Sequence, residues 1–78
     1  METIYVLVSV SSGKLEDVLS AARKVESVKE AHAVTGRYDI IIKMEGKNLA
    51  ALLNEIVKEI RKIDGVEETE SLIAIDLP

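Results

Sequence analysis

The stretch that decides the fold is LAALLNEIVKEIRKI, which runs from Leu49 to Ile63. Its large apolar residues recur every three or four positions, at Leu49, Leu52, Leu53, Ile56, Val57, Ile60 and Ile63. This spacing places them along one side of an α-helix. We expect Lys47 or Asn48 to begin the helix. Asp64-Gly65 should end it, because glycine readily adopts the backbone conformation that closes a helix.

Stretches typical of β-strands lie on both sides of this helix. Residues 38–44 (YDIIIKM) predict a strong strand, and residues 28–35 predict a weaker strand before it. The pair Gly36-Arg37 separates these two runs and predicts a hairpin. After the helix, a final strand is expected from Val66 or Thr69 to about Leu77.

The first part of the chain repeats the alternation of strand and helix. Residues 4–10 (IYVLVSV) predict a strand, and residues 14–25 carry apolar residues at helical spacing. Ser12 or Gly13 is expected to cap that helix. The order is therefore β-α-β-β-α-β, the ferredoxin-like arrangement of the α+β class. It predicts a four-stranded antiparallel sheet with both helices on one face.

The predicted strands are apolar on both faces. In the first strand, Tyr5 and Leu7 lie opposite to the face of Ile4, Val6 and Val8. Two later strands also carry an apolar residue on this second face, which is Ile41 in the strand of residues 38–44 and Leu72 in the final strand. A sheet face that no helix covers is usually polar in a monomer. We therefore expect two sheets to pack face to face in a dimer, although extra β-branched residues could also reflect strand propensity alone.

Length and composition narrow the possible functions. A chain of 78 residues has room for a single domain, residues 1–78. It contains no cysteine and one histidine, so the sequence predicts no metal site and no other cofactor. A net charge of −4 argues against direct nucleic-acid binding. No apolar run is long enough to span a membrane and no signal peptide is evident, so a cytoplasmic location is expected. The charged fraction of 31% and the absence of Gln are typical of proteins from hot environments.

The sequence contains no signature of a catalytic site. The carboxylates are spread over helix surfaces, and the acidic residues between Glu67 and Glu70 suit a solvated edge better than a cation site. His32 stands alone, and the serines before Gly13-Lys14 do not match a phosphate-binding loop. The segment Thr35-Gly36-Arg37-Tyr38-Asp39 is a better candidate for binding, because Gly36 allows close backbone approach and Asp39 could accept an ammonium group. A plain hairpin would use the same residues.

Two segments of the chain resemble the effector domain of the Lrp/AsnC transcription regulators, also called the RAM domain. The first is VTGRYDIIIK at residues 34–43, and the second is IDGVEETES at residues 63–71. The resemblance covers nearly the whole chain. The helix-turn-helix domain usual in that family is missing before Met1, so the chain resembles the stand-alone members. Arg37 departs from the small or acidic residue common at that position.

The resemblance implies an amino-acid effector and no catalysis. Such domains pair through their sheets, and the dimers assemble into discs such as octamers or decamers that hold amino acids between dimers. Backbone N–H groups near Gly36, Arg37 and Tyr38 would then hold the ligand carboxylate, and Asp39 would face its ammonium group. Thr69 and Ser71 would complete the polar contacts, together with Thr35 at the start of the hairpin. Full-length Lrp/AsnC regulators are the expected partners.

Two other functions share this predicted fold. A small dimeric αβ-barrel enzyme would need a base at the mouth of a cleft, and His32 is the only histidine available. An ACT-type regulatory domain also binds amino acids, but its sheets associate edge to edge and not face to face.

Overall fold

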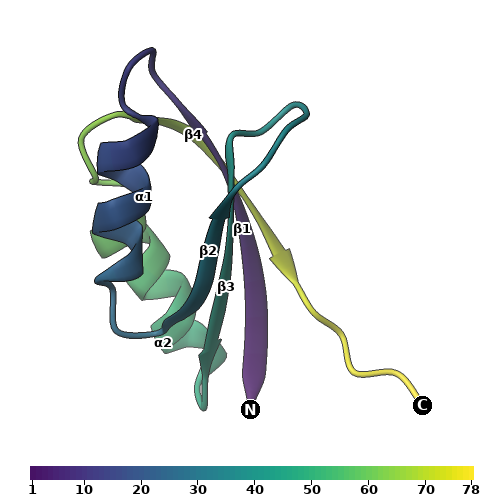
Figure 1. Ribbon diagram of the computed structural model, residues 1–78. Coiled ribbons are helices and arrows are strands. Elements are labelled where there is room, and N and C mark those ends of the chain that lie inside the picture. The colour runs from purple at the N-terminus through teal and green to yellow at the C-terminus, as the bar shows by residue number, and fades with distance from the viewer.

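The computed structural model describes all 78 residues and has the predicted β-α-β-β-α-β order. Its elements are β1 (Glu2–Val10), α1 (Leu15–Arg23), β2 (Val28–Ala33), β3 (Ile40–Gly46), α2 (Leu49–Glu55), the helical turn η1 (Ile56–Ile60) and β4 (Val66–Ile73). The strands form one antiparallel sheet in the order β2-β3-β1-β4. Figure 1 shows both helices on the same side of this sheet. The predicted ferredoxin-like fold is confirmed.

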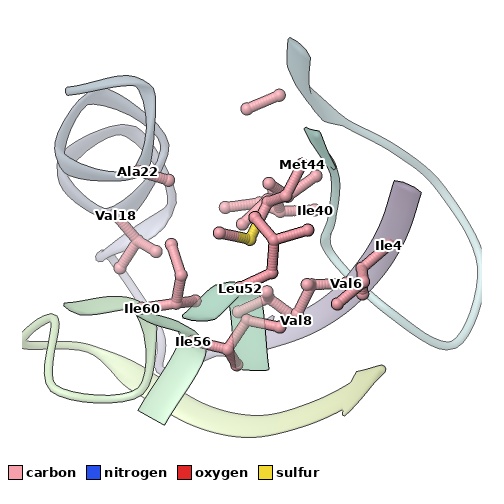
Figure 2. Close-up of a cluster of buried hydrophobic side chains, with 12 residues drawn as sticks. Ile4, Val6, Val8, Val18, Ala22, Ile40, Met44, Leu52, Ile56 and Ile60 are labelled. Carbon is pink, nitrogen blue, oxygen red and sulfur yellow. The ribbon is translucent and has the colours of Figure 1, made fainter. Parts of the chain in front are cut away.

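The core fills the space between the helices and one face of the sheet (Figure 2). Alternate residues of the central strands point into it, so β1 contributes Ile4, Val6 and Val8. Of the apolar stripe predicted on the second helix, Leu52, Ile56 and Ile60 are buried in the core, and no polar side chain is buried with them. Leu49 and Ile63 are partly buried against the core, whereas Leu53 and Val57 are exposed. The remaining core residues are Val18, Ala22, Ala31, Ile40, Ile42 and Met44.

Helix α2 begins where the sequence predicted and then departs from regular geometry. The Asn48 side chain caps it by accepting a hydrogen bond from the Ala51 N–H at 3.0 Å. In η1 the helix widens to a π-helical turn, in which the Arg61 N–H donates to the Ile56 carbonyl five residues back at 2.9 Å. The wider turn still buries both Ile56 and Ile60. Apolar spacing alone does not distinguish such a turn from a regular one.

The predicted cap of α1 is wrong. Lys14 occupies the capping position without a side-chain hydrogen bond, and both Ser12 and Gly13 are exposed in the preceding turn. Ser11 makes the structural contact instead. Its N–H donates to the Gly65 carbonyl at 2.9 Å and its hydroxyl donates to the same oxygen at 3.3 Å. These bonds join the connection before α1 to the connection before β4, which are far apart in the sequence.

Two strand boundaries also differ from the prediction. The connection between β2 and β3 spans residues 34–39, because Asp39 bonds to the Val34 N–H and to β1 and so closes a longer loop than Gly36-Arg37 alone. Strand β4 ends at Ile73 and not near Leu77, because the chain diverges from β1 after the hydrogen bond from the Ala74 N–H to the Thr3 carbonyl. The apolar alternation continues to Leu77, and that pattern extended the predicted strand.

Gly65 occupies a crowded position between η1 and β4. Its φ of +104° is unfavourable for residues with a side chain, and an added Cβ would lie 2.7 Å from the Lys14 Cβ. Gly36 in the β2–β3 loop has a similar φ of +114°, but an added Cβ there would meet no atom within 4 Å. A side chain would therefore cause backbone strain at both positions, but it would clash with neighbouring atoms only at Gly65.

We expect Gly65→Ala to lower the free energy of unfolding by clearly more than Gly36→Ala. Both changes carry a backbone cost of about 1–3 kcal/mol, but only the first forces Lys14 and Val18 to move. Equilibrium denaturation in urea at one fixed protein concentration measures the difference. Equal losses of unfolding free energy in the two variants would contradict the close packing of Gly65 against Lys14 and Val18.

Candidate functional site

The β2–β3 loop carries five of the predicted ligand-binding residues, Thr35 to Asp39. The loop projects beyond the end of the sheet in Figure 1. A hydrogen bond of 2.9 Å from the Val34 N–H to the Asp39 carbonyl closes its base. The N–H groups of Gly36, Arg37 and Tyr38 donate no hydrogen bond within the chain. The structure therefore brings these five residues together around free backbone donors.

Asp39 fixes the loop to the end of β1. Its N–H donates to the Val8 carbonyl at 2.8 Å, and its Oδ2 accepts a hydrogen bond from the Val10 N–H at 2.8 Å. The second carboxylate oxygen, Oδ1, accepts no hydrogen bond from the chain. Asp39 thus has a structural role in the loop, and one oxygen is left to accept another donor.

Tyr38 connects the loop to β4 across β1. Its hydroxyl donates to Glu70 Oε1 at 2.7 Å, and the Arg37 guanidinium lies 5.2 Å from the centre of the Tyr38 ring. The hydrogen bond to Glu70 is the main cause that raises the pKa of Tyr38, and desolvation adds to it. The sequence analysis did not identify Glu70 as a partner of the loop. Its place between Thr69 and Ser71 in a strand already indicated that it points to the opposite face.

Thr69 and Ser71 lie on the helix side of β4, away from Tyr38 and Glu70. They pair in register with Val8 and Val6, whose side chains point to the helices. Here they border an open groove of about 490 Å³ between β4 and the second helix, lined further by Leu53, Ile56, Val57, Arg61, Val66, Glu67 and Glu68. Within one chain, the structure therefore separates the two hydroxyl residues from the loop.

The sheet face without helices has an apolar centre and a charged rim. Tyr5 pairs with Leu72, and Leu7 pairs with Ile41, along the middle of this face. On its β2 side, Glu30 contacts His32 Nε2 at 3.1 Å and Lys43 Nζ at 4.0 Å. The hydrogen bond with His32, followed by the charge of Lys43, lowers the pKa of Glu30. We call this surface the open face below.

Two general features bear on the kind of site. No three His, Asp or Glu side chains gather closely enough to hold a metal ion. Neither helix is long and apolar enough to cross a membrane. The candidate binding features described above are the free donors of the β2–β3 loop, the groove beside β4 and the open face.

The small ferredoxin-like domain thus combines a loop of free backbone donors with an apolar open face. The sequence of this chain matches the family model of the Lrp/AsnC ligand binding domain over residues 3–78. The chain belongs to this family.

Relatives and solved structures agree with this assignment. The chain is 35% identical over 71 residues to the HTH-type transcriptional regulator FL11 of Pyrococcus abyssi, covering 91% of this chain and 46% of the relative. It is 38% identical over 66 residues to the regulatory protein AsnC of Escherichia coli, and the match covers 81% of this chain and 43% of AsnC. The chain thus spans about half the length of these regulators. The crystal structure of FFRP-DM1 superposes with a TM-score of 0.90 at 36% identity, covering 96% of this chain and all of the other.

One enzyme also contains a similar region. The homocitrate synthase of Sulfolobus acidocaldarius is 35% identical over 71 residues, which cover 87% of this chain but 15% of the enzyme. So small a share carries no enzymatic activity over to this chain.

We expect Glu70→Gln to lower the pKa of Tyr38, because the variant removes the carboxylate that holds the phenolic proton. Ultraviolet titration of phenolate formation measures this in a Tyr5→Phe background, which leaves Tyr38 as the only tyrosine. Glu68→Gln is the matched control, because Glu68 acts on Tyr38 through its charge alone and more weakly. Equal changes in both variants would show that the 2.7 Å bond does not form in solution.

Proposed function

We propose that this domain binds a free amino acid between dimers of an oligomer that the chain forms with itself. The ligand would regulate transcription through full-length regulators of the same family, into whose assemblies the domain would exchange. Membership in a ligand-binding family of transcription regulators supports the general function. The contacts described above support the particular ligand class and the place of its site.

The distribution of the predicted ligand residues is the observation that carries this proposal. The loop donors and the Thr69 and Ser71 hydroxyls lie on separate surfaces of one chain. A small ligand that contacts both sets would lie where the loop of one copy meets the β4 groove of another. A site divided in this way would couple ligand binding to assembly, because neither copy holds the complete set of contacts.

The loop suits the carboxylate of an amino acid. Its free N–H groups at Gly36, Arg37 and Tyr38 can donate to an anion, and the open space beside Gly36 leaves room for it. The free Oδ1 of Asp39 could accept one hydrogen bond from the ammonium group. A regulator from Neisseria meningitidis with the same fold, 21% identical and with a TM-score of 0.85, was crystallised as a complex with L-Met.

The apolar open face supports the dimer. Leu72 is 45% exposed, and Tyr5, Leu7 and Ile41 are half-buried although no element covers them. Face-to-face packing of two sheets would remove these side chains from water. Octamers or decamers would then arise from contacts between dimers. That the domain acts without a DNA-binding domain, and in the cytoplasm, stays a prediction.

The family match favours this function over the alternatives. It selects the Lrp/AsnC type over the ACT type, which the sequence left open. An enzyme of the αβ-barrel type would depend on His32, but the His32 side chain pairs with Glu30 at the edge of the open face, on the side of the sheet away from the helices.

Native mass spectrometry with a pool of the twenty amino acids tests the proposal. We expect an even-numbered oligomer whose mass increases by whole amino-acid increments. Thr69→Val and Ser71→Ala each remove one hydroxyl while nearly conserving shape, and we expect each to weaken binding about tenfold, the equivalent of about 1.4 kcal/mol. Ser20→Ala on the exposed surface of α1 is the matched control and should bind normally.

Asp39→Ala should weaken binding further, because the variant removes an acceptor and also frees the loop from Val10. Asp64→Ala is its control, since Asp64 is an exposed carboxylate that contacts Lys14. An oligomer that takes up no amino acid under any condition would refute the ligand class while leaving the assembly intact.

A further inference from the structure

The last residues of the chain leave the sheet while β1 still offers backbone to pair with. The Ala74 N–H donates to the Thr3 carbonyl at 3.0 Å, and this is the last hydrogen bond between the two strands. Beyond it the chain diverges from the start of β1 and leaves a hollow of about 360 Å³ lined by Met1, Glu2, Thr3, Ala74, Ile75 and Asp76. We call Ile75–Pro78 the tail.

The tail presents large apolar side chains to solvent. Ile75 is 77% exposed and Leu77 is 79% exposed, among the largest exposures of any apolar side chain in the structure. Together with Ile73 they continue the alternating pattern of a strand, with Asp76 between them. Such a sequence is suited to lie extended against an apolar surface.

The tail points toward the side of the sheet that has no helices. In Figure 1 it runs away from the helices and past the open face. No hydrogen bond joins Ile75–Pro78 to the open face of the same chain. To reach that face, these residues would have to reverse direction, because Tyr5 lies beside Leu72, behind the point where they leave the sheet.

We propose that the tail of each chain packs on a second copy of the chain and buries Ile75 and Leu77 there. This rests on the proposed face-to-face dimer. The surface that the tail approaches is continuous with the open face, where Leu72 already presents an apolar side chain to the partner. A copy seated on the open face would lie beside both tails. The tails would thus extend the interface beyond the sheets and tie each chain to its partner.

Leu77→Asp tests the proposal through the dissociation constant of the dimer. We expect the constant to rise about tenfold or more, because each dimer would lose two buried leucine side chains. Leu15→Asp is the matched control, since Leu15 is an exposed leucine on α1 in the helix layer. Sedimentation equilibrium over a dilution series measures both variants. Unchanged dissociation constants in both variants would overturn the proposal.

A second variant shows where the tail lies. The chain has no tryptophan, so Leu77→Trp provides a single indole, which can be excited at wavelengths that the two tyrosines do not absorb. We expect its emission to be shifted to the blue and protected from acrylamide in the dimer. On dilution, or with Leu72→Glu added to separate the sheets, it should become exposed.

Three outcomes of this experiment contradict the proposal in different ways. An exposed indole in an intact dimer would refute the docked tail and leave the dimer standing. An indole that stays protected in the monomer would show a contact within one chain. An unaltered chain that is monomeric at every concentration would remove the dimer, and the docked tail with it.

Discussion

The structure depends on one constraint, which is that two helices can cover only one face of a four-stranded sheet whose strands are apolar on both sides. The helices bury Ile4, Val6 and Val8 completely, together with the alternate residues of β3. The side chains between them, such as Tyr5 and Leu7, lie on the open face. A domain of this size gains little stability from a single core. Covering the second face therefore matters both for the stability of the domain and for its assembly.

The candidate ligand site follows from the same arrangement. Strand β4 lies at the edge of the sheet, and side chains on its two faces contact different parts of the molecule. Glu70 reaches Tyr38 on the open side, whereas Thr69 and Ser71 face the groove beside the second helix. A ligand that needs both surfaces must lie where copies of the chain meet. Ligand binding would then favour assembly, and assembly would favour ligand binding.

Much of this could be predicted from the sequence, because hydrophobic period determines which element forms and which face is buried. The spacing from Leu49 to Ile63 predicted the second helix, and Asn48 caps it. Contacts between distant residues could not be predicted in this way. Ser11 bonds to Gly65 and does not cap α1, and Asp39 anchors the loop to Val10. The apolar alternation also continues past Ile73, although the chain leaves β1 there and the strand ends.

The molar mass of the unaltered chain tests the central claim most directly. Sedimentation equilibrium, extended to micromolar concentrations and below, reports whether the open face is covered by a second copy. We predict a mass that is an even multiple of the 8.6 kDa chain and that falls only on strong dilution. A mass of 8.6 kDa at every concentration would show that the apolar open face is stable in water, and would contradict the account.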